Sequence, residues 1–170
     1  VVLSGSLPPG VPAGWYADLV KALRPWGCRI AVDTSDAPLL ALAAEFPGAA
    51  PDLLKPNSEE LAQLTGADPE ALEASAAAGD PTGCVEAART LVEQGVGAVM
   101  ATLGGAGAVL VTAEGAWHAT PPPITVRSTV GAGDSSVAGY VLADTRDLSA
   151  PDRLRLAVAY GSAAASLAGT

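Results

Sequence analysis

Short apolar runs alternate with amphipathic stretches along the 170-residue chain, and this alternation predicts its secondary structure. Strands are expected at residues 1–4, 29–33, 53–54, 98–103, 108–112 and 116–120. Helices are expected at residues 13–26, 37–46, 58–64, 84–94, 135–143 and 151–167. Strands that alternate with helices are typical of parallel βαβ units, so the pattern predicts an α/β fold. The last two strands are expected to form a hairpin.

Three segments refine this picture. One face of the first helix is expected to be buried through its apolar residues, Trp15, Leu19, Ala22, Leu23 and Trp26. Residues 67–83 mix Ala, Asp, Pro and Gly and are expected to be a surface excursion. Residues 121–123 are three prolines, which are typical of a stiff connector rather than a domain boundary. Residues 1–170 are therefore expected to be one domain.

Composition and charge narrow the range of functions. Hydrophobic residues make up 49% of the chain and charged residues 16%, which suits a soluble core. The formal net charge is -9 with nine scattered Lys and Arg residues, so a nucleic-acid surface is not expected. No apolar run reaches the ~18 residues of a membrane span. Cys28 and Cys84 lack metal-ligand spacing, which fits structural thiols in a reducing cytoplasm.

The segment from Ser128 to Ser136 places small residues and one carboxylate where a loop is expected to turn into a helix. Gly131 and Gly133 let the backbone approach a ligand, and free amides at a helix N-terminus attract phosphate oxygens. Asp134 in the same turn can accept a proton from a hydroxyl nucleophile. The alternative is a glycine turn in which Asp134 caps the helix, and spacing alone does not separate the two.

Two further motifs also have two interpretations each. Asn57 and Glu60 share one face at the opening of a predicted helix, as a metal-bound water shell requires. The alternative is a helix cap formed by Asn57 or Ser58, with Glu60 favouring the helix dipole. The segment TLGGAG at residues 102–107 follows a strand, and its glycines let a nucleotide lie against the backbone. A tight turn between strands explains this segment equally well.

Other residues and absent motifs bear on the reaction class. Ser6 follows the first predicted strand, where parallel sheets display ligands, although Pro8 also suits a rigid turn. His118 lies in the predicted hairpin and is expected to be packed or solvent-facing rather than catalytic. The chain has neither GxxxxGK[ST] nor a GxGxxG with a correctly spaced acidic residue, which disfavours P-loop NTPases and Rossmann dehydrogenases.

Four motifs occur in a fixed order: GSLPPG at 5–10, KPNSEE at 55–60, TLGGAGA at 102–108 and GAGD at 131–134. In this order and spacing they closely resemble the ribokinase-like sugar kinases, also called the phosphofructokinase B family. The residues within these motifs are most similar to those of the hexose-phosphate branch, which includes 1-phosphofructokinase and tagatose-6-phosphate kinase. The resemblance covers the whole chain but only the later part of the family's pattern. It implies an αβα sandwich with a mainly parallel central sheet, whose N-terminal part and lid are missing.

The resemblance also implies roles for individual residues. Asp134 would be the catalytic base, and charge on the transferring group would be stabilised by the backbone amides of Gly131, Ala132 and Gly133. ATP would be contacted by Lys55, Asn57, Thr102, Gly104, Gly107, Gly161 and Ser162. Mg²⁺ would be ordered through water by Asn57 and Glu60, and the sugar would be bordered by Ser6. Ribokinase usually has an Asp where Ser128 stands, which speaks against its monovalent-cation site here.

The implied reaction is transfer of the ATP γ-phosphoryl group to a phosphorylated ketohexose, with fructose 1-phosphate giving fructose 1,6-bisphosphate as the favoured case. Tagatose 6-phosphate or fructose 6-phosphate is the alternative acceptor, and a nucleotide-binding module without kinase activity is an alternative of another class. Because the chain opens directly on a strand-like Val1-Val2-Leu3, we expect a fragment that is inactive alone. The complete protein is expected in the cytoplasm, and a homodimer is left open.

Overall fold

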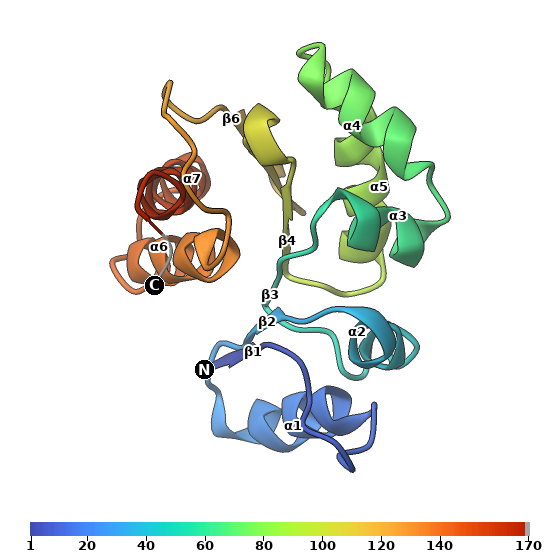
Figure 1. Cartoon of the computed structure of the whole chain (residues 1–170). Coiled ribbons are helices and arrows are strands. Elements are labelled where there is room, and N and C mark those ends of the chain that lie inside the picture. The colour runs from blue at the N-terminus through green and yellow to red at the C-terminus, as the bar shows by residue number, and fades with distance from the viewer. Residues whose placement is uncertain (169–170) are drawn as a thin grey trace.

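A six-stranded sheet forms the middle layer of the computed structural model, which describes residues 1–168 (Figure 1). Its strands are β1 (Val2–Ser4), β2 (Ala31–Asp33), β3 (Leu53–Leu54), β4 (Ala98–Thr102), β5 (Ala108–Thr112) and β6 (Gly115–Ala119). The strands lie in chain order across the sheet. Strands β1 to β4 are parallel, and β4, β5 and β6 are antiparallel. The predicted mainly parallel sheet and its terminal hairpin are therefore confirmed.

Seven α-helices cover the two faces of this sheet in the described part of the chain (Figure 1). They are α1 (Trp15–Leu23), α2 (Asp36–Ala43), α3 (Ser58–Thr65), α4 (Pro69–Ala77), α5 (Thr82–Glu93), α6 (Ala132–Asp144) and α7 (Ala150–Ala165). Helices α1 to α5 lie on one side and α6 and α7 on the other (Figure 1). Two 3₁₀ turns, η1 (Arg24–Trp26) and η2 (Gly104–Ala106), complete the elements. The predicted αβα sandwich is confirmed.

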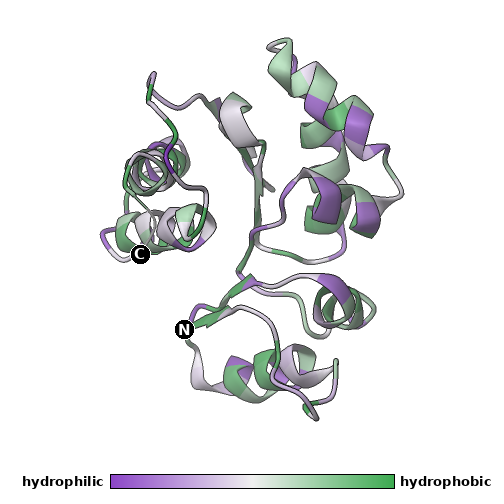
Figure 2. Cartoon of the chain, in the orientation of Figure 1, coloured by the Kyte–Doolittle hydropathy of each residue, from purple (hydrophilic) through white to green (hydrophobic). Residues whose placement is uncertain are grey.

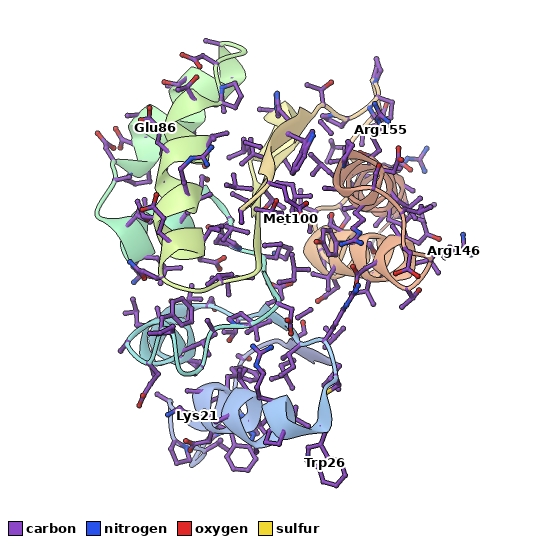
Figure 3. All side chains as sticks on the ribbon, turned by 180° about the vertical axis from the view of Figure 1, so that it is seen from behind. Lys21, Trp26, Glu86, Met100, Arg146 and Arg155 are labelled. Carbon is purple, nitrogen blue, oxygen red and sulfur yellow. The ribbon has the colours of Figure 1, made fainter. Side chains whose placement is uncertain are left out.

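Burial on both faces of the sheet explains why residues 98–101 of β4 are all apolar. Val99 and Ala101 pack into the core beneath α1 to α5, whereas Ala98 and Met100 pack into the core beneath α6 and α7. A strand covered on both faces needs apolar residues at every position. Figure 3 shows Met100 in the interior of the molecule, and Figure 2 shows hydrophobic colouring along the central strands.

Residues 67–83 lie mostly at the surface, as predicted, but they contain a helix, α4, that the sequence pattern did not predict. The helix begins after Asp68, whose carboxylate accepts hydrogen bonds from the backbone amides of Glu70 and Ala71. Pro69 occupies the first helical position, where its missing N–H costs nothing. Leu72 and Ala76 are buried against the core. Only two of the nine residues of α4 are buried, so its apolar periodicity is weak. The sequence signal for this helix is its N-cap, Asp68, followed by Pro69.

The predicted buried face of the first helix is also wrong. The buried residues of α1 are Tyr16, Ala17 and Val20. Trp26 belongs to η1 and is 84% exposed, and Figure 3 shows it projecting outward. The hydroxyl of Tyr16 donates hydrogen bonds to the carbonyls of Ser4, the last residue of β1, and Gly5, so this side of the helix faces the sheet. Trp15 is accordingly 46% exposed.

Two remaining expectations concern membranes and thiols. None of the helices in the described part of the chain combines the length and apolar character needed to cross a membrane. Cys28 and Cys84 are free thiols, the first half-buried and the second buried. Burial raises the pKa of the Cys84 thiol, which disfavours the reactive thiolate.

Gly107, at the turn between η2 and β5, gives a test of the fold. Its φ is +93°, and a Cβ there would overlap the carbonyl of Ala119 on the neighbouring strand. We expect Gly107→Ala to lower the free energy of unfolding by about 2 kcal/mol or more, since a strained backbone alone costs ~1–3 kcal/mol. Urea unfolding of this chain measures the change.

Gly105 supplies the matched control because it lies in the same turn. A Cβ at Gly105 would meet no heavy atom within 4 Å, and its φ is outside the positive region. Gly105→Ala should therefore change the free energy of unfolding by no more than ~0.5 kcal/mol, the usual range for surface substitutions. Equal stability of the two variants would contradict the backbone constraint at Gly107.

Candidate active site

The carboxyl ends of the parallel strands place several polar side chains at one edge of the sheet. Ser4 ends β1, Asp33 ends β2 directly opposite it, and Lys55 follows β3. Asn57, two residues further, bridges to Thr102 at the end of β4. Ligands of open parallel sheets bind beyond this edge. The topology therefore brings four separate segments of sequence to one place.

A buried ion pair lies at the centre of this edge. The Lys55 Nζ lies 3.0 Å from the Asp33 Oδ1, and their side chains are only 8% and 15% exposed. Burial raises the pKa of the Asp33 carboxyl, the Lys55 cation opposes this rise, and the negative charge of Asp134 adds to it. A Cβ built on Gly133 would lie 3.4 Å from the Lys55 Nζ. The ammonium group thus sits against the first turn of α6.

The first turn of α6 carries the predicted anion cradle. Gly131 is the N-cap at φ +77°, and no side chain caps the helix. The amide of Ala132 donates to the Thr129 carbonyl at 3.2 Å, and the Ser135 amide to the Gly131 carbonyl at 2.9 Å. Within the described residues, the amides of Gly131 and Gly133 have no such partner. Of the three amides predicted to bind the transferring group, Ala132 is therefore already engaged.

Asp134 lies one residue beyond this cradle. It is in the first turn of α6 but is not the cap, so the alternative of an ordinary capping role is wrong. Its side chain is exposed, and its Oδ1 accepts a hydrogen bond from the Ser4 Oγ at 3.0 Å. The sequence motifs did not single out Ser4 or assign a role to Asp33. The signal available for both was their place at the ends of adjacent strands.

A cavity of about 300 Å³ extends from the cradle between the glycine-rich turn and α7. It is lined by predicted nucleotide residues from two segments, Thr102, Gly104, Gly107, Gly161 and Ser162, together with Gly133 of the cradle. Aliphatic side chains from the connecting segment and α7 complete the wall, among them Ile124, Val126 and Val158. This volume is at the lower end of the ~300–1,000 Å³ typical of ligand pockets.

The small residues of α7 also have a packing role. A Cβ on Gly161 would collide with the Ser136 Oγ of α6, so the absent side chain allows the two helices to approach closely. The Ser162 Oγ donates to the Val158 carbonyl at 2.7 Å, and the Ser136 Oγ to the Ala132 carbonyl at 3.0 Å. This segment of α7 is therefore closely packed against α6, and the cavity lies beside it.

Asn57 and Glu60 form a capping box at the start of α3. The Asn57 Oδ1 accepts from the Glu60 amide at 2.7 Å, and the Glu60 Oε2 accepts from the Asn57 amide at 2.9 Å. Burial raises the pKa of the Glu60 carboxyl, while the Asn57 amide and Lys55 oppose the rise. Residues 1–168 contain no group of three or more His, Cys, Asp or Glu side chains placed to hold a metal. The capping interpretation is thus realised.

Two further residues stand apart from this cluster. Ser6 is exposed in the loop after β1, and no hydrogen bond joins its side chain to another predicted site residue within residues 1–168. The loop itself is anchored, because Tyr16 and Thr34 donate to the Gly5 carbonyl at 2.8 Å and 2.9 Å. His118 lies with its Nε2 2.8 Å from the Ala106 carbonyl, which fits the expected structural role.

Comparison with known proteins identifies the fold and the family. The pattern of the pfkB family carbohydrate kinases matches residues 1–170. The chain is 44% identical over 161 residues to the 1-phosphofructokinase of Rhodobacter capsulatus, which covers 94% of this chain and 46% of that protein. It is 36% identical over 171 residues to the ATP-dependent 6-phosphofructokinase isozyme 2 of Escherichia coli strain K12, covering 100% of this chain and 52% of that protein.

Solved structures give the same result. The phosphofructokinase-2 from Escherichia coli in complex with potassium superposes with a TM-score of 0.85 at 36% identity, covering 99% of this chain and 51% of that one. Arabidopsis thaliana ribokinase complexed with ribose and ATP superposes with a TM-score of 0.72 at 24% identity, which shows the shared fold; the match covers 99% of this chain and 50% of that one. The chain spans about half the length of the curated relatives that it matches. Because the family pattern extends over all of its residues, the chain belongs to the pfkB family of carbohydrate kinases.

Proposed function

We propose that this chain is the nucleotide-binding and catalytic half of an ATP-dependent sugar-phosphate kinase. The observation that carries the proposal is the position of Asp134, a carboxylate one residue beyond the open amides of Gly131 and Gly133, the second of which adjoins the Lys55 ammonium. A base, an anion site and a cation in one place are the parts that phosphoryl transfer to a hydroxyl requires. The favoured acceptor is fructose 1-phosphate, because several relatives are named 1-phosphofructokinase.

Asp134 would accept the proton of the acceptor hydroxyl as its oxygen attacks the γ-phosphorus. Its exposure at the helix start leaves it accessible to an acceptor from solvent. The bond between the γ-phosphorus and the bridging oxygen breaks, and ADP leaves with the electron pair. A positioned base of this kind contributes ~10²–10⁴-fold to rate.

The cradle and Lys55 would stabilise the charge on the transferring group. The amides of Gly131 and Gly133 lie at the positive end of the α6 dipole, and Lys55 supplies a full positive charge beside Gly133. Asp33 holds that ammonium in place through the buried ion pair. The adenosine moiety would occupy the cavity between the glycine-rich turn and α7.

Mg²⁺ would be ordered through water by Asn57 and Glu60. Both side chains use oxygen lone pairs in the capping box, yet a carboxylate and an amide oxygen retain further acceptor capacity for metal-bound water. Mg²⁺ keeps several waters in most protein sites, so this indirect arrangement fits its chemistry. When bound, the ion neutralises phosphate charge.

Two alternatives remain in the proposal. Fructose 6-phosphate is favoured as acceptor by the 6-phosphofructokinase relative, and tagatose 6-phosphate belongs to the same reaction class. A nucleotide-binding module without kinase activity is the alternative of another class, and the chain spans about half the length of its relatives. Ser6 would border the sugar, whose remaining contacts would come from the other half of a complete enzyme.

The first functional test compares this chain with a polypeptide extended at its amino terminus to the length of the curated relatives, hereafter the extended polypeptide. We expect sugar-dependent ADP release by the extended polypeptide, highest with fructose 1-phosphate, and none above background by the 170-residue chain. In the extended polypeptide, Asp134→Asn should lower turnover at least ~100-fold with little change in the KM for ATP.

The control for that variant is Asp18→Asn. Asp18 is likewise exposed in the first turn of a helix, but it lies on α1, and within residues 1–168 no side-chain hydrogen bond or ion pair joins it to a predicted site residue. Its replacement should leave turnover unchanged. Near-normal turnover of Asp134→Asn would remove this residue from the mechanism, and sugar-dependent turnover by the short chain would show that it is not an incomplete kinase.

Glu60→Gln separates metal ordering from helix capping. Gln preserves a capping box, so the free energy of unfolding should change by no more than ~1 kcal/mol. If Glu60 orders the metal shell, the Mg²⁺ concentration for half-maximal turnover of the extended polypeptide should rise severalfold. Glu59→Gln, its exposed neighbour, is the control. An unchanged Mg²⁺ titration would leave Glu60 with the capping role alone.

A further inference from the structure

One hydrogen bond joins the catalytic end of α6 to the edge strand of the sheet. The Ser4 Oγ donates to the Asp134 Oδ1 at 3.0 Å, across 130 residues of sequence. Ser4 lies outside the residues to which the motifs assign a role. Its contact with the proposed base is therefore an observation of the structure alone.

The backbone that carries this hydroxyl is held firmly. Ser4 pairs with Asp33 across the sheet, and the next amide, that of Gly5, donates to the Asp33 carbonyl at 2.9 Å. The Ser4 carbonyl accepts from the Tyr16 hydroxyl at 3.1 Å. The hydroxyl is consequently presented to Asp134 from a fixed position, although its own side chain is exposed.

A groove lies between α6 and β1, and the Ser4–Asp134 bond crosses it at one end of the helix. The groove has a volume of about 480 Å³ and is lined chiefly by aliphatic side chains, among them Val2, Val137 and Val141, with Ser4 and Asp134 also on its wall. At the opposite end of α6, Asp144 pairs with Arg29 and Arg153, each at 2.7 Å. The Ser4 bond is the corresponding polar contact at the catalytic end.

We propose that Ser4 is a positioning residue for Asp134. The inference rests on the proposed function, in which Asp134 is the base. By donating to Oδ1, the Ser4 hydroxyl fixes the rotamer of the carboxylate and leaves Oδ2 to accept the proton of the sugar hydroxyl. A base held in one orientation loses less conformational freedom in the transition state, which raises kcat rather than sugar affinity.

A hydrogen bond from Ser to Asp is not in itself unusual in this chain. Ser149 donates to Asp152 at 2.6 Å, and Ser35 donates to Asp36 at 2.9 Å. Both pairs are local contacts at the start of a helix, and neither carboxylate adjoins the cradle of α6. Ser149→Ala is therefore the matched control, since it removes the same chemical contact at a distant helix.

The test uses the extended polypeptide with saturating sugar phosphate and ATP. We expect Ser4→Ala to lower kcat about 10-fold, which is the effect of ~1.4 kcal/mol on the barrier, without a change in the KM for ATP. Ser4→Thr keeps a hydroxyl on a strand position that favours β-branched residues, so kcat should return to within about twofold of the parent. Ser149→Ala should match the parent.

A double-mutant cycle separates positioning from general structural damage. If Ser4 acts through Asp134, adding Ser4→Ala to Asp134→Asn should lower the residual turnover by less than about twofold, because the carboxylate that Ser4 orients is gone. An additive loss in the double variant would overturn the proposal. A raised KM for the sugar with unchanged kcat would also overturn it, since Ser4 would then bind sugar instead.

The same data separate this inference from the proposed function. Full turnover of Ser4→Ala together with inactive Asp134→Asn would reject Ser4 as a positioning residue and leave the base in place. Active Asp134→Asn would reject the base and the inference that rests on it. Failure of Ser4→Thr to restore kcat while Ser4→Ala is impaired would also count against the proposal.

Discussion

The buried ion pair between Lys55 and Asp33 is the contact on which the rest of the site depends. A buried ammonium without a partner is costly, so Asp33 must face it where β2 and β3 end. The first turn of α6 then lies against the same amine at Gly133, where an added Cβ would come to within 3.4 Å of the Lys55 Nζ. The pair therefore fixes how far the proposed anion cradle stands from the sheet. It also gives Asp33 a role, as the partner of the buried Lys55, although Asp33 lies outside every motif.

Local positive potential explains how a chain with a net charge of -9 suits an anionic nucleotide. Charges farther away than the ~8–10 Å screening length at physiological salt contribute little. Lys55 and the N-terminal end of α6 act at contact distance, where a glycine N-cap leaves the amides open. The apolar cavity beside them would take the part of a nucleotide that carries no charge.

Most of the fold was predictable because apolar periodicity and turn residues encode it locally, as in the hairpin of β5 and β6. Helix α4 was missed because its evidence is the Asp68 cap rather than a strong apolar stripe. The glycine turn at the start of α6 was predictable from Gly131, because its positive φ favours glycine, whereas anion binding at this turn stays a prediction. Ser4 was not, because its role arises from a contact across 130 residues that only the topology creates. The nucleotide and sugar roles of individual residues stay predictions.

The most direct test of the central claim is a crystal structure of this chain with Mg²⁺ and a non-hydrolysable ATP analogue. The terminal phosphate should lie on the first turn of α6, with oxygens within about 3 Å of the Gly133 amide and the Lys55 Nζ, which is hydrogen-bond distance. The base and ribose should fill the cavity between the glycine-rich turn and α7. A phosphate bound away from α6, or a Lys55 that contacts only Asp33 while the nucleotide is fully ordered, would contradict the claim.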